Sequence, residues 1–446
     1  MSFLGWMHAP EESLAQWDEL VALAGAANAA GLDRTLVCGM GGSSLVADVL
    51  AETFRVPHLH VLDSTNPAAV RAAGDDADLA RTLFVISSKS GTTVETLAFC
   101  HHFAARARPE QFVAITETDS PLAALARERR FRAVIPHPRD VGGRYSALTA
   151  IGMLPAALGG IDGRELLART RRVDVAAAKA LGRSIGEAAK TGRDKLRVSP
   201  PPSLGGLASW IEQLIAESSG KDGRGVVPIV QDPAGAALPD LQAVVAHVFS
   251  ADPLDLGMEF LRWEYATASL CEIMGVNAFD QPDVEEAKKL ARIELAAMGR
   301  GGGGGGGGQH AAPLQTMTPQ QLRNSARPGD YCAILAYVPA TPGVYTKLQD
   351  LRAAWGRALG CATTLGIGPR YLHSTGQLHK GGPASGLFLV ITTDVSTDIE
   401  IPEMGTSFGA LHRAQARGDV RALLARGRRV SHVNLSTLAE LAQIQP

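Results

Sequence analysis

A run of hydroxyl side chains at residues 87–96, SSKSGTTVET, is the part of the sequence best suited to chemistry. It follows the strand-like run LFVIS and opens a helical pattern that continues to about Arg106. Unpaired N–H groups at a helix start carry partial positive charge and stabilise an anion. The added donors are four hydroxyls and one ammonium group, from Ser88, Lys89, Ser90, Thr92 and Thr93. This combination predicts a site for a dianionic phosphate monoester. The alternative is an ordinary Ser/Thr N-cap beside a solvated lysine.

Two glycine-rich turns could lie next to this loop. CGMGGSS at residues 38–44 follows the first strand-like run and contains Ser43. It lacks the third glycine of a dinucleotide-binding fingerprint, so a second anion-holding turn is the better interpretation. In DVGGRYSALTAIG at residues 140–152, Arg144 follows Gly143 and precedes a helical pattern. Arg144 is either a surface arginine after a turn or a cation presented to the same edge of a sheet.

Three later segments carry further candidates. Gln213 and Glu217 are spaced i, i+4 and so share a helix face, where Glu217 is either a solvated carboxylate or a base facing a cleft. In NAFDQPDVEEAKK at residues 277–289, Gln281 and Lys288 face either a ligand or solvent. His373 stands six residues before the next histidine, which disfavours a metal pair and leaves a single acid/base histidine possible.

The elements that must position these residues alternate between strand and helix. Five strand-like runs separated by helical patterns start near residue 30: RTLVCGM, HLHVLD, LFVIS, FVAIT and FRAVIP. Such alternation predicts a parallel sheet covered by helices on both faces, with ligands at the carboxyl ends of its strands. We predict a helical segment at 1–29, one α/β unit at 30–160 and a second at 161–446. Eight glycines at 301–308 predict a flexible loop that interrupts the second unit.

Composition narrows the class of protein. The chain has 446 residues and a formal net charge of −2, so nothing indicates binding to nucleic acid or to an anionic membrane. We find no apolar run long enough to span a bilayer and no export signal at the N-terminus. The five cysteines lack CxxC spacing and predict reduced core residues, with neither a disulfide frame nor a metal site. We therefore expect a cytoplasmic protein.

Six segments together resemble the motifs of glucose-6-phosphate isomerases: SSKSGTTVET, GMGGSS, DVGGRYSALTAIG, AESSGKDG, FDQPDVEEAKK and LHSTGQ. The similarity is closest to the isomerase portion of fused transaldolase–glucose-6-phosphate isomerase chains, which also have segments like FLGWMHAPEE and FLRWEYATA. It extends from about residue 4 to residue 436. In ordinary family members the histidine motif precedes the FDQ motif, whereas here it follows, as in the fused chains.

The resemblance implies a fold and a set of roles. The expected fold is α/β, with two sugar-isomerase (SIS) domains that are each a parallel sheet between two helical layers. Phosphate would be bound by Ser88, Ser90, Thr92 and Thr93, with Ser43, Lys89 and Gly143 nearby. Glu217 would be the base that moves a proton between C1 and C2, and Arg144 would stabilise the enediolate. Lys288 and His373 would assist ring opening, while Gln213 and Gln281 would contact the substrate.

The implied activity is the reversible isomerisation of glucose 6-phosphate to fructose 6-phosphate through a cis-enediol or enediolate. A carboxylate can carry that proton without a metal or a redox cofactor, so we expect none. The resemblance also implies a homodimer in which the histidine is donated across the subunit boundary. Two alternatives stay open: a dual glucose/mannose-6-phosphate isomerase, and a sugar-phosphate-binding regulator without catalysis. The candidate base argues against the regulator, because a protein that only binds needs no base.

Overall fold

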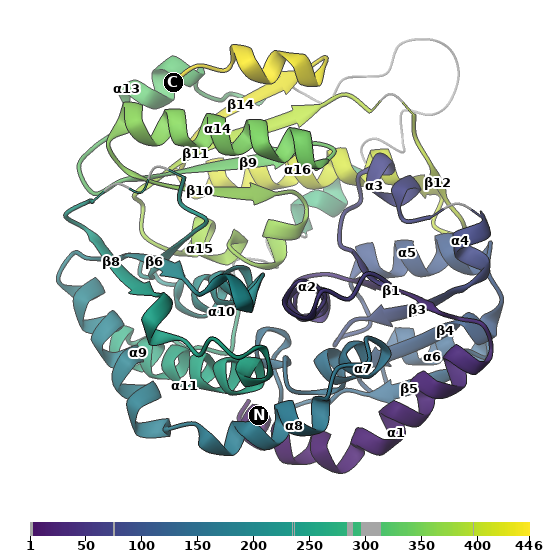
Figure 1. Ribbon diagram of the computed structural model, residues 1–446. Coiled ribbons are helices and arrows are strands. Elements are labelled where there is room, and N and C mark those ends of the chain that lie inside the picture. The colour runs from purple at the N-terminus through teal and green to yellow at the C-terminus, as the bar shows by residue number, and fades with distance from the viewer. Residues whose placement is uncertain are drawn as a thin grey trace, which may run out of the picture.

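The computed structural model describes residues 3–74, 76–233, 235, 237–282, 289–295, 314–395 and 397–446. Its first sheet has five parallel strands in the order β2–β1–β3–β4–β5. These strands are β1 (Arg34–Gly39), β2 (Leu59–Leu62), β3 (Thr82–Ser87), β4 (Phe112–Thr116) and β5 (Ala133–Pro136). All five correspond to the runs predicted from sequence, and Figure 1 shows β1, β3, β4 and β5 side by side.

Helices cover both faces of this sheet. They must, because apolar and polar residues do not alternate along its strands, so both faces need to be buried. One face packs Val37 and Val85 against α1 (Ala9–Ala29), α2 (Gly42–Phe54) and α7 (Ala150–Leu158). The other packs Phe84 and Ile86 against α5 (Val94–Ala104) and α6 (Pro121–Glu128). Short helices α3 (Pro67–Ala72) and α4 (Asp76–Ala80) precede β3. The first unit therefore has the predicted three layers.

The second unit contains two more parallel sheets. One has the order β7–β6–β8, and the other has the order β10–β9–β11–β14. The strands are β6 (Lys195–Ser199), β7 (Val227–Val230), β8 (Leu241–Val245), β9 (Tyr331–Tyr337), β10 (Ala362–Ile367), β11 (Gly386–Thr393) and β14 (Arg429–Leu435). A two-stranded hairpin, β12 (Glu400–Ile401) with β13 (Thr406–Ser407), precedes the last helix.

A buried arginine joins these two sheets. Arg352 lies on α14 (Pro342–Leu359), is 1% exposed, and donates to the carbonyl of Val230 at 2.9 Å and to the carbonyl of Thr363. Val230 ends β7 and Thr363 lies in β10, so one guanidinium connects the facing edges of the two sheets. Because a buried charge is tolerated only when its donors are satisfied, these carbonyls hold the sheet edges together.

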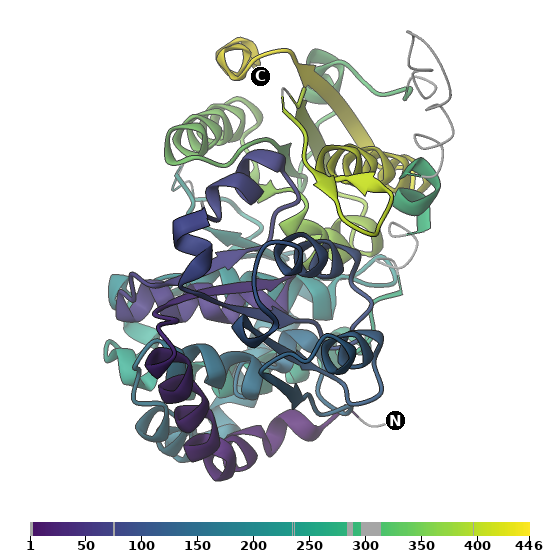
Figure 2. The same cartoon turned by 90° about the vertical axis from the view of Figure 1, so that its right-hand side faces the viewer.

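Two helices belong to both units. The helix α10 (Leu207–Ser219) places Trp210 and Leu214 in the core around α2, and its Ala216 packs beneath the second unit. The helix α16 (Phe408–Ala425) packs Phe408 against Phe99 of α5, and its Val420 lies under the four-stranded sheet. Figure 2 shows the C-terminal elements, coloured yellow, at the top of the molecule, with the purple and blue N-terminal elements below them.

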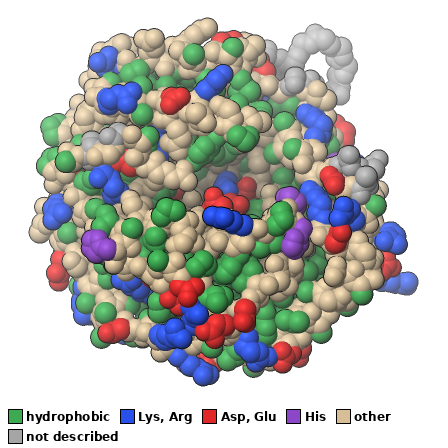
Figure 3. All heavy atoms as spheres, in the orientation of Figure 1, with side chains coloured by type: hydrophobic (Ala, Val, Ile, Leu, Met, Phe, Trp, Pro, Cys, Tyr) green, Lys and Arg blue, Asp and Glu red, His purple; other side chains and the backbone are tan. Residues whose placement is uncertain are grey.

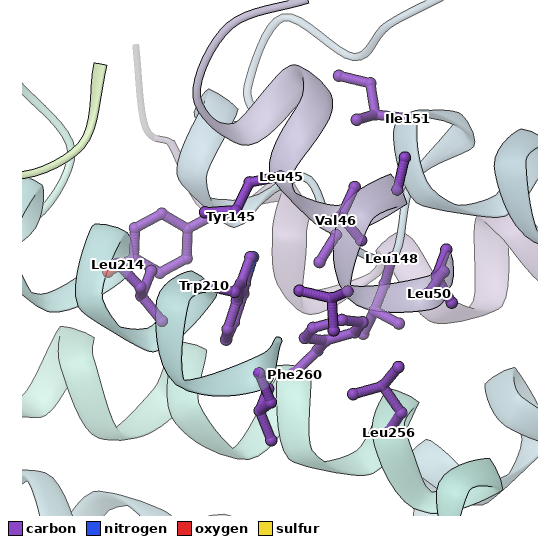
Figure 4. Close-up of a cluster of buried hydrophobic side chains, with 14 of the residues drawn as sticks. Leu45, Val46, Leu50, Tyr145, Leu148, Ile151, Trp210, Leu214, Leu256 and Phe260 are labelled. Atoms are coloured by element: carbon purple, nitrogen blue, oxygen red, sulfur yellow. The ribbon is translucent and has the colours of Figure 1, made fainter. Parts of the chain in front are cut away.

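Further helices of the described residues are α8 (Gly163–Arg169), α9 (Val175–Lys190), α11 (Leu256–Met274), α13 (Pro319–Asn324) and α15 (Gly376–Gly381). The helices α8, α9 and α11 complete the core beside α10, whereas α13 packs against β11 and β14. Figure 4 shows Trp210 and Phe260 at the centre of this cluster, where their ring centroids are 4.7 Å apart.

Some boundaries differ from the predicted ones. From sequence, the stretch Asp222–Leu256 looks short for the usual strand and crossover, yet it holds both β7 and β8. The helical pattern that follows Arg144 predicts a helix from Ser146, but α7 begins at Ala150, after a 3₁₀ turn at residues 143–145. The poly-glycine tract at 301–308 and most of the helix predicted from Val284 lie outside the described residues.

The close packing of α9 on α11 gives a test of the fold. A Cβ atom at Gly182 would stand 1.9 Å from the carbonyl oxygen of Ala266, so Gly182→Ala must push the helices apart. We expect a loss of about 1–3 kcal/mol in the free energy of unfolding, measured by urea denaturation. The control is Gly25→Ala on α1, which meets nothing within 4 Å. It should stabilise by about 0.5–1 kcal/mol, and a loss equal to that of Gly182→Ala would contradict this account.

Candidate active site

The hydroxyl loop joins the end of β3 to the start of α5, as predicted. The Ser88 and Thr93 hydroxyls lie 3.0 Å apart, and those of Ser90 and Thr92 lie 2.9 Å apart. Thr93 is the N-cap residue of α5, and its side chain makes no capping hydrogen bond. The ordinary N-cap explanation is therefore wrong for Thr93, and its hydroxyl stays beside the helix N-terminus. This end of α5 presents both hydroxyls and backbone N–H groups to an anion.

The other predicted phosphate ligands are less directly placed. Lys89 Nζ lies 3.8 Å from Glu117 and 4.6 Å from the ring centroid of Phe3. Burial lowers the pKa of Lys89, and the nearby Glu117 carboxylate opposes that shift. Ser43 is buried in the first turn of α2. Gly143 packs against the same turn, since a Cβ atom at Gly42 would stand 2.0 Å from its carbonyl oxygen.

A buried ion pair lies at the C-terminal end of α10. An Arg144 guanidinium nitrogen is 2.8 Å from Glu217 Oε1, and the two side chains are 4% and 9% exposed. The Gln213 amide donates to Glu217 Oε2 at 3.1 Å and to the backbone carbonyl of His373 at 2.9 Å. Glu217 is thus a buried carboxylate with two neighbours of the predicted set, Arg144 and Gln213, and the solvated interpretation is wrong.

The turn at residues 277–281 holds the arginine in place. Arg144 donates to the carbonyls of Ala278 and Asp280 at 3.0 and 2.8 Å. Lys221 anchors the same turn, because its ammonium group bonds the Asn277 carbonyl and lies 2.8 Å from Asp280. Burial lowers the pKa of Lys221, and the positive charge of Arg144 lowers it further. The fixed turn leaves Arg144 little freedom to move.

One cavity connects the hydroxyl loop with this cluster. Gln281 accepts from Arg144 at 3.2 Å and also lines the cavity. The polar part of the wall consists of Ser90, Thr92, Thr93, Glu95, Gln281, Arg292, His373, Gln415 and Asp419. The Arg144–Glu217 pair lies one residue behind that wall, beyond Gln281. Such an arrangement can hold an anionic substrate at one end and place a carboxylate and a fixed cation near its other end.

His373 enters this cavity from the same chain. Its Nε2 lies 2.9 Å from Glu95 Oε1, in the first turn of α5. The resemblance implied donation of this histidine across a subunit boundary, but here the short 3₁₀ helix Arg370–His373 carries it to the site within one chain. The changed order of the motifs therefore still brings the histidine to the hydroxyl loop.

Sequence reasoning missed three residues of the site. Its prediction for one further residue could not be tested. Lys221 and Glu95 stand inside motifs that the sequence displayed, and the charge of each could have marked it as a candidate. Gln415 lies in an unremarkable helix, where no sequence signal marks it. Lys288, predicted to assist ring opening, lies outside the described residues.

The comparisons with known proteins now bear on this geometry. Residues 22–174 match the family model of phosphoglucose isomerase. This stretch includes the hydroxyl loop and Arg144, and it confirms the resemblance drawn from the motifs.

Individual relatives agree with the family match. A probable glucose-6-phosphate isomerase of Haloarcula marismortui is 36% identical over 215 residues, which cover 44% of this chain and 49% of that protein. A glucose-6-phosphate isomerase of Acaryochloris marina is 35% identical over 209 residues, covering 41% and 39%. The chain thus spans about half the length of the curated relatives it matches. A solved glucose-6-phosphate isomerase of Chlamydia trachomatis shares the fold, with a TM-score of 0.53 at 19% identity over 65% of this chain and 73% of that chain.

A second cavity lies on the other side of α10. It is lined by Asp48, Glu52, Glu212 and Arg370, among others. Figure 3 shows acidic and basic side chains gathered around a hollow in the middle of one face.

Across the described ranges, no helix is long and apolar enough to cross a membrane.

Glu212 in this second cavity gives a prediction about pH. Burial raises the pKa of Glu212 to about 7, although the positive charges of Arg352 and Arg370 act to lower it. Between pH 4.5 and 7 the folded state therefore holds a proton that the unfolded state has lost, and stability falls as pH rises. Glu212→Gln removes this titration. Its free energy of unfolding relative to wild type should rise by about 1–3 kcal/mol between pH 5 and pH 8, after allowance for partial exposure.

The measurement is urea denaturation of both proteins at several pH values. Glu272→Gln, at an exposed position of α11, is the matched control and should keep a constant difference from wild type. A constant difference for Glu212→Gln as well would show that Glu212 does not titrate in this range.

Proposed function

We propose that the protein interconverts glucose 6-phosphate and fructose 6-phosphate. The observation that carries this proposal is the buried Glu217 carboxylate, held 2.8 Å from Arg144 behind a cavity whose opposite wall is a hydroxyl loop at a helix N-terminus. The phosphoglucose isomerase family match over residues 22–174 supports the same reaction.

Glu217 acts as the base in this mechanism. The carboxylate takes the C2 proton of the open-chain aldose and returns it to C1, which converts the aldehyde into the ketose. Negative charge develops on the enediolate oxygen, and Arg144 stabilises it with a charge that does not titrate. The hydroxyl loop holds the remote phosphate and so orients the reacting carbons. Gln213 holds Glu217, and Gln281 holds Arg144, in position beside the substrate.

Ring opening must precede this step, because the sugar arrives as a closed ring. A proton leaves the C1 hydroxyl and another reaches the ring oxygen as the C1–O5 bond breaks. We assign this transfer to His373, together with Lys288, whose role rests on the motif resemblance alone. An imidazole suits both halves of the exchange because it gains and loses a proton near neutral pH.

The wider setting of the enzyme is part of the proposal. The family resemblance supports a homodimer, and the cysteine pattern supports the cytoplasm as its location. We also propose the division into a helical segment at 1–29 and SIS-type units at 30–160 and 161–446. The separate sheets of the two units support that division.

The role of Glu217 can be tested by Glu217→Gln. We expect turnover to fall by about 10²–10⁴-fold while the affinity for a sugar-acid phosphate inhibitor stays unchanged, because the amide keeps the shape but cannot take a proton. The assay supplies fructose 6-phosphate and follows NADPH formation through glucose-6-phosphate dehydrogenase. Glu212→Gln, on the same helix but facing the other cavity, is the matched control. Near-normal turnover of Glu217→Gln would remove Glu217 from the mechanism.

The hydroxyl loop should control binding more than turnover. Ser88→Ala combined with Thr93→Ala removes two hydroxyls next to the helix N-terminus, and each such bond to a charged group contributes about 1.5–3 kcal/mol. We expect the inhibitor dissociation constant to rise by at least about tenfold, measured by calorimetry. The control removes two hydroxyls that do not line the cavity, by Ser325→Ala with Thr346→Ala. An unchanged dissociation constant in the loop variant would place the phosphate elsewhere.

A further inference from the structure

A chain of buried hydrogen bonds leads from α16 to His373. The Thr65 hydroxyl lies 2.7 Å from Gln415 Oε1, and Gln415 Nε2 lies 2.6 Å from Glu95 Oε1. The same Glu95 oxygen is 2.9 Å from His373 Nε2. Thr65, Gln415 and Glu95 are at most 4% exposed. Groups this deeply buried need hydrogen-bond partners inside the protein, and these bonds provide them with such partners.

The direction of each hydrogen bond can be assigned from the chemistry of the groups. An ionised carboxylate only accepts, so both Gln415 Nε2 and His373 Nε2 donate to Glu95. The Gln415 amide oxygen must then accept from the Thr65 hydroxyl, which is already oriented toward it. Thr65 in turn lies 3.1 Å from Nδ1 of His412, a buried imidazole whose pKa burial lowers to about 4. With its only hydrogen given to Gln415, the Thr65 oxygen accepts from His412 Nδ1–H.

This order fixes the tautomer of the histidine that faces the cavity. His373 carries its hydrogen on Nε2, where it is held by Glu95. Nδ1 is then the nitrogen that can exchange a proton with a substrate. If the Gln415 amide were turned around, its oxygen would face the Glu95 carboxylate and repel it. The Thr65 hydroxyl opposes that rotation, since a turned amide would place an NH₂ group where the hydroxyl now donates to the amide oxygen.

We propose that Gln415, oriented by Thr65, is a positioning residue for His373. It acts through Glu95 and does not itself move a proton. The proposal rests on the proposed function, because it concerns how His373 is held for the ring-opening step of that reaction. It also explains why a helix of the second unit carries a buried amide at the wall of the cavity: α16 completes a site whose carboxylate comes from α5 of the first unit.

The test replaces Gln415 by Met, which keeps the length of the side chain and removes the donor. The first readout is the tautomer of His373, seen in long-range proton–nitrogen spectra of protein labelled at histidine and assigned with His373→Gln. We expect the Nε2–H signal to weaken or shift in Gln415→Met. The second readout is the exchange between the two anomers of glucose 6-phosphate, followed by exchange spectroscopy. Anomer exchange needs only ring opening, and we expect it to slow by about tenfold or more, up to the roughly 10²–10⁴-fold effect of losing an acid/base group entirely.

A pair of variants at Thr65 provides the control. Thr65→Ser keeps the hydroxyl and should behave like the wild type in both readouts. Thr65→Val removes the hydroxyl at nearly constant volume, which lets the amide turn, and should reproduce the effects of Gln415→Met. Because Thr65 and Gln415 belong to different units, a common effect in two folded variants cannot come from damage to one element.

The outcomes separate this proposal from the proposed function. An unchanged His373 tautomer in folded Gln415→Met and Thr65→Val would overturn the positioning role. The His373 tautomer could change in both variants while the wild type shows neither isomerisation nor anomer exchange. That result would support the positioning role and overturn the proposed function. Glu217→Gln should retain anomer exchange while losing isomerisation, which separates ring opening from proton transfer between carbons.

Discussion

The buried contact between Arg144 and Glu217 is the constraint on which the rest of the site depends. Two charges taken out of water cost several kcal/mol each unless their remaining donors and acceptors are satisfied. The protein meets this demand from three directions: the 277–281 turn offers carbonyls, Gln213 offers an amide, and Lys221 holds the turn. The role of base that we propose for Glu217 depends on these neighbours, because the groups that satisfy the buried carboxylate also fix where it points.

This demand explains why the site lies where the two units meet. Arg144 follows the first sheet, Glu217 ends a helix that packs on both units, and His373 follows β10 of the second. Neither unit alone supplies both charges and the hydroxyl loop. The shared helices α10 and α16 therefore do more than pack: they bring groups from distant parts of the chain within hydrogen-bond distance. A rigid core around Trp210 and Phe260 keeps that spacing constant.

The sequence predicts the parts of this structure that arise locally. The hydroxyl loop could be found because strand, loop and helix start are consecutive, and Gln213 and Glu217 because a helix places i and i+4 on one face. The strands of the first sheet are continuous apolar runs and were all predicted. What could not be predicted depends on contacts between distant segments. The division of the second unit into two sheets is one example. Arg352 bonds the carbonyl of Val230, more than 100 positions away, and that of Thr363 on the strand after its own helix. The bond from Gln415 to Glu95 also connects residues more than 100 positions apart.

The position of the histidine shows how far a site can be separated from chain order. Its motif follows the FDQ motif here, although ordinary family members have the reverse order. A parallel sheet presents the carboxyl ends of its strands at one edge, whatever the order in which the chain visits them. His373 needs only to follow a strand whose carboxyl end faces the hydroxyl loop. The strand β10 meets that condition from the four-stranded sheet of the second unit, although the loop follows β3 of the first sheet. The proposed chemistry therefore depends on how the strand ends of the two units face each other and on the bonds that hold each side chain there, and the order of the segments can change without moving these groups.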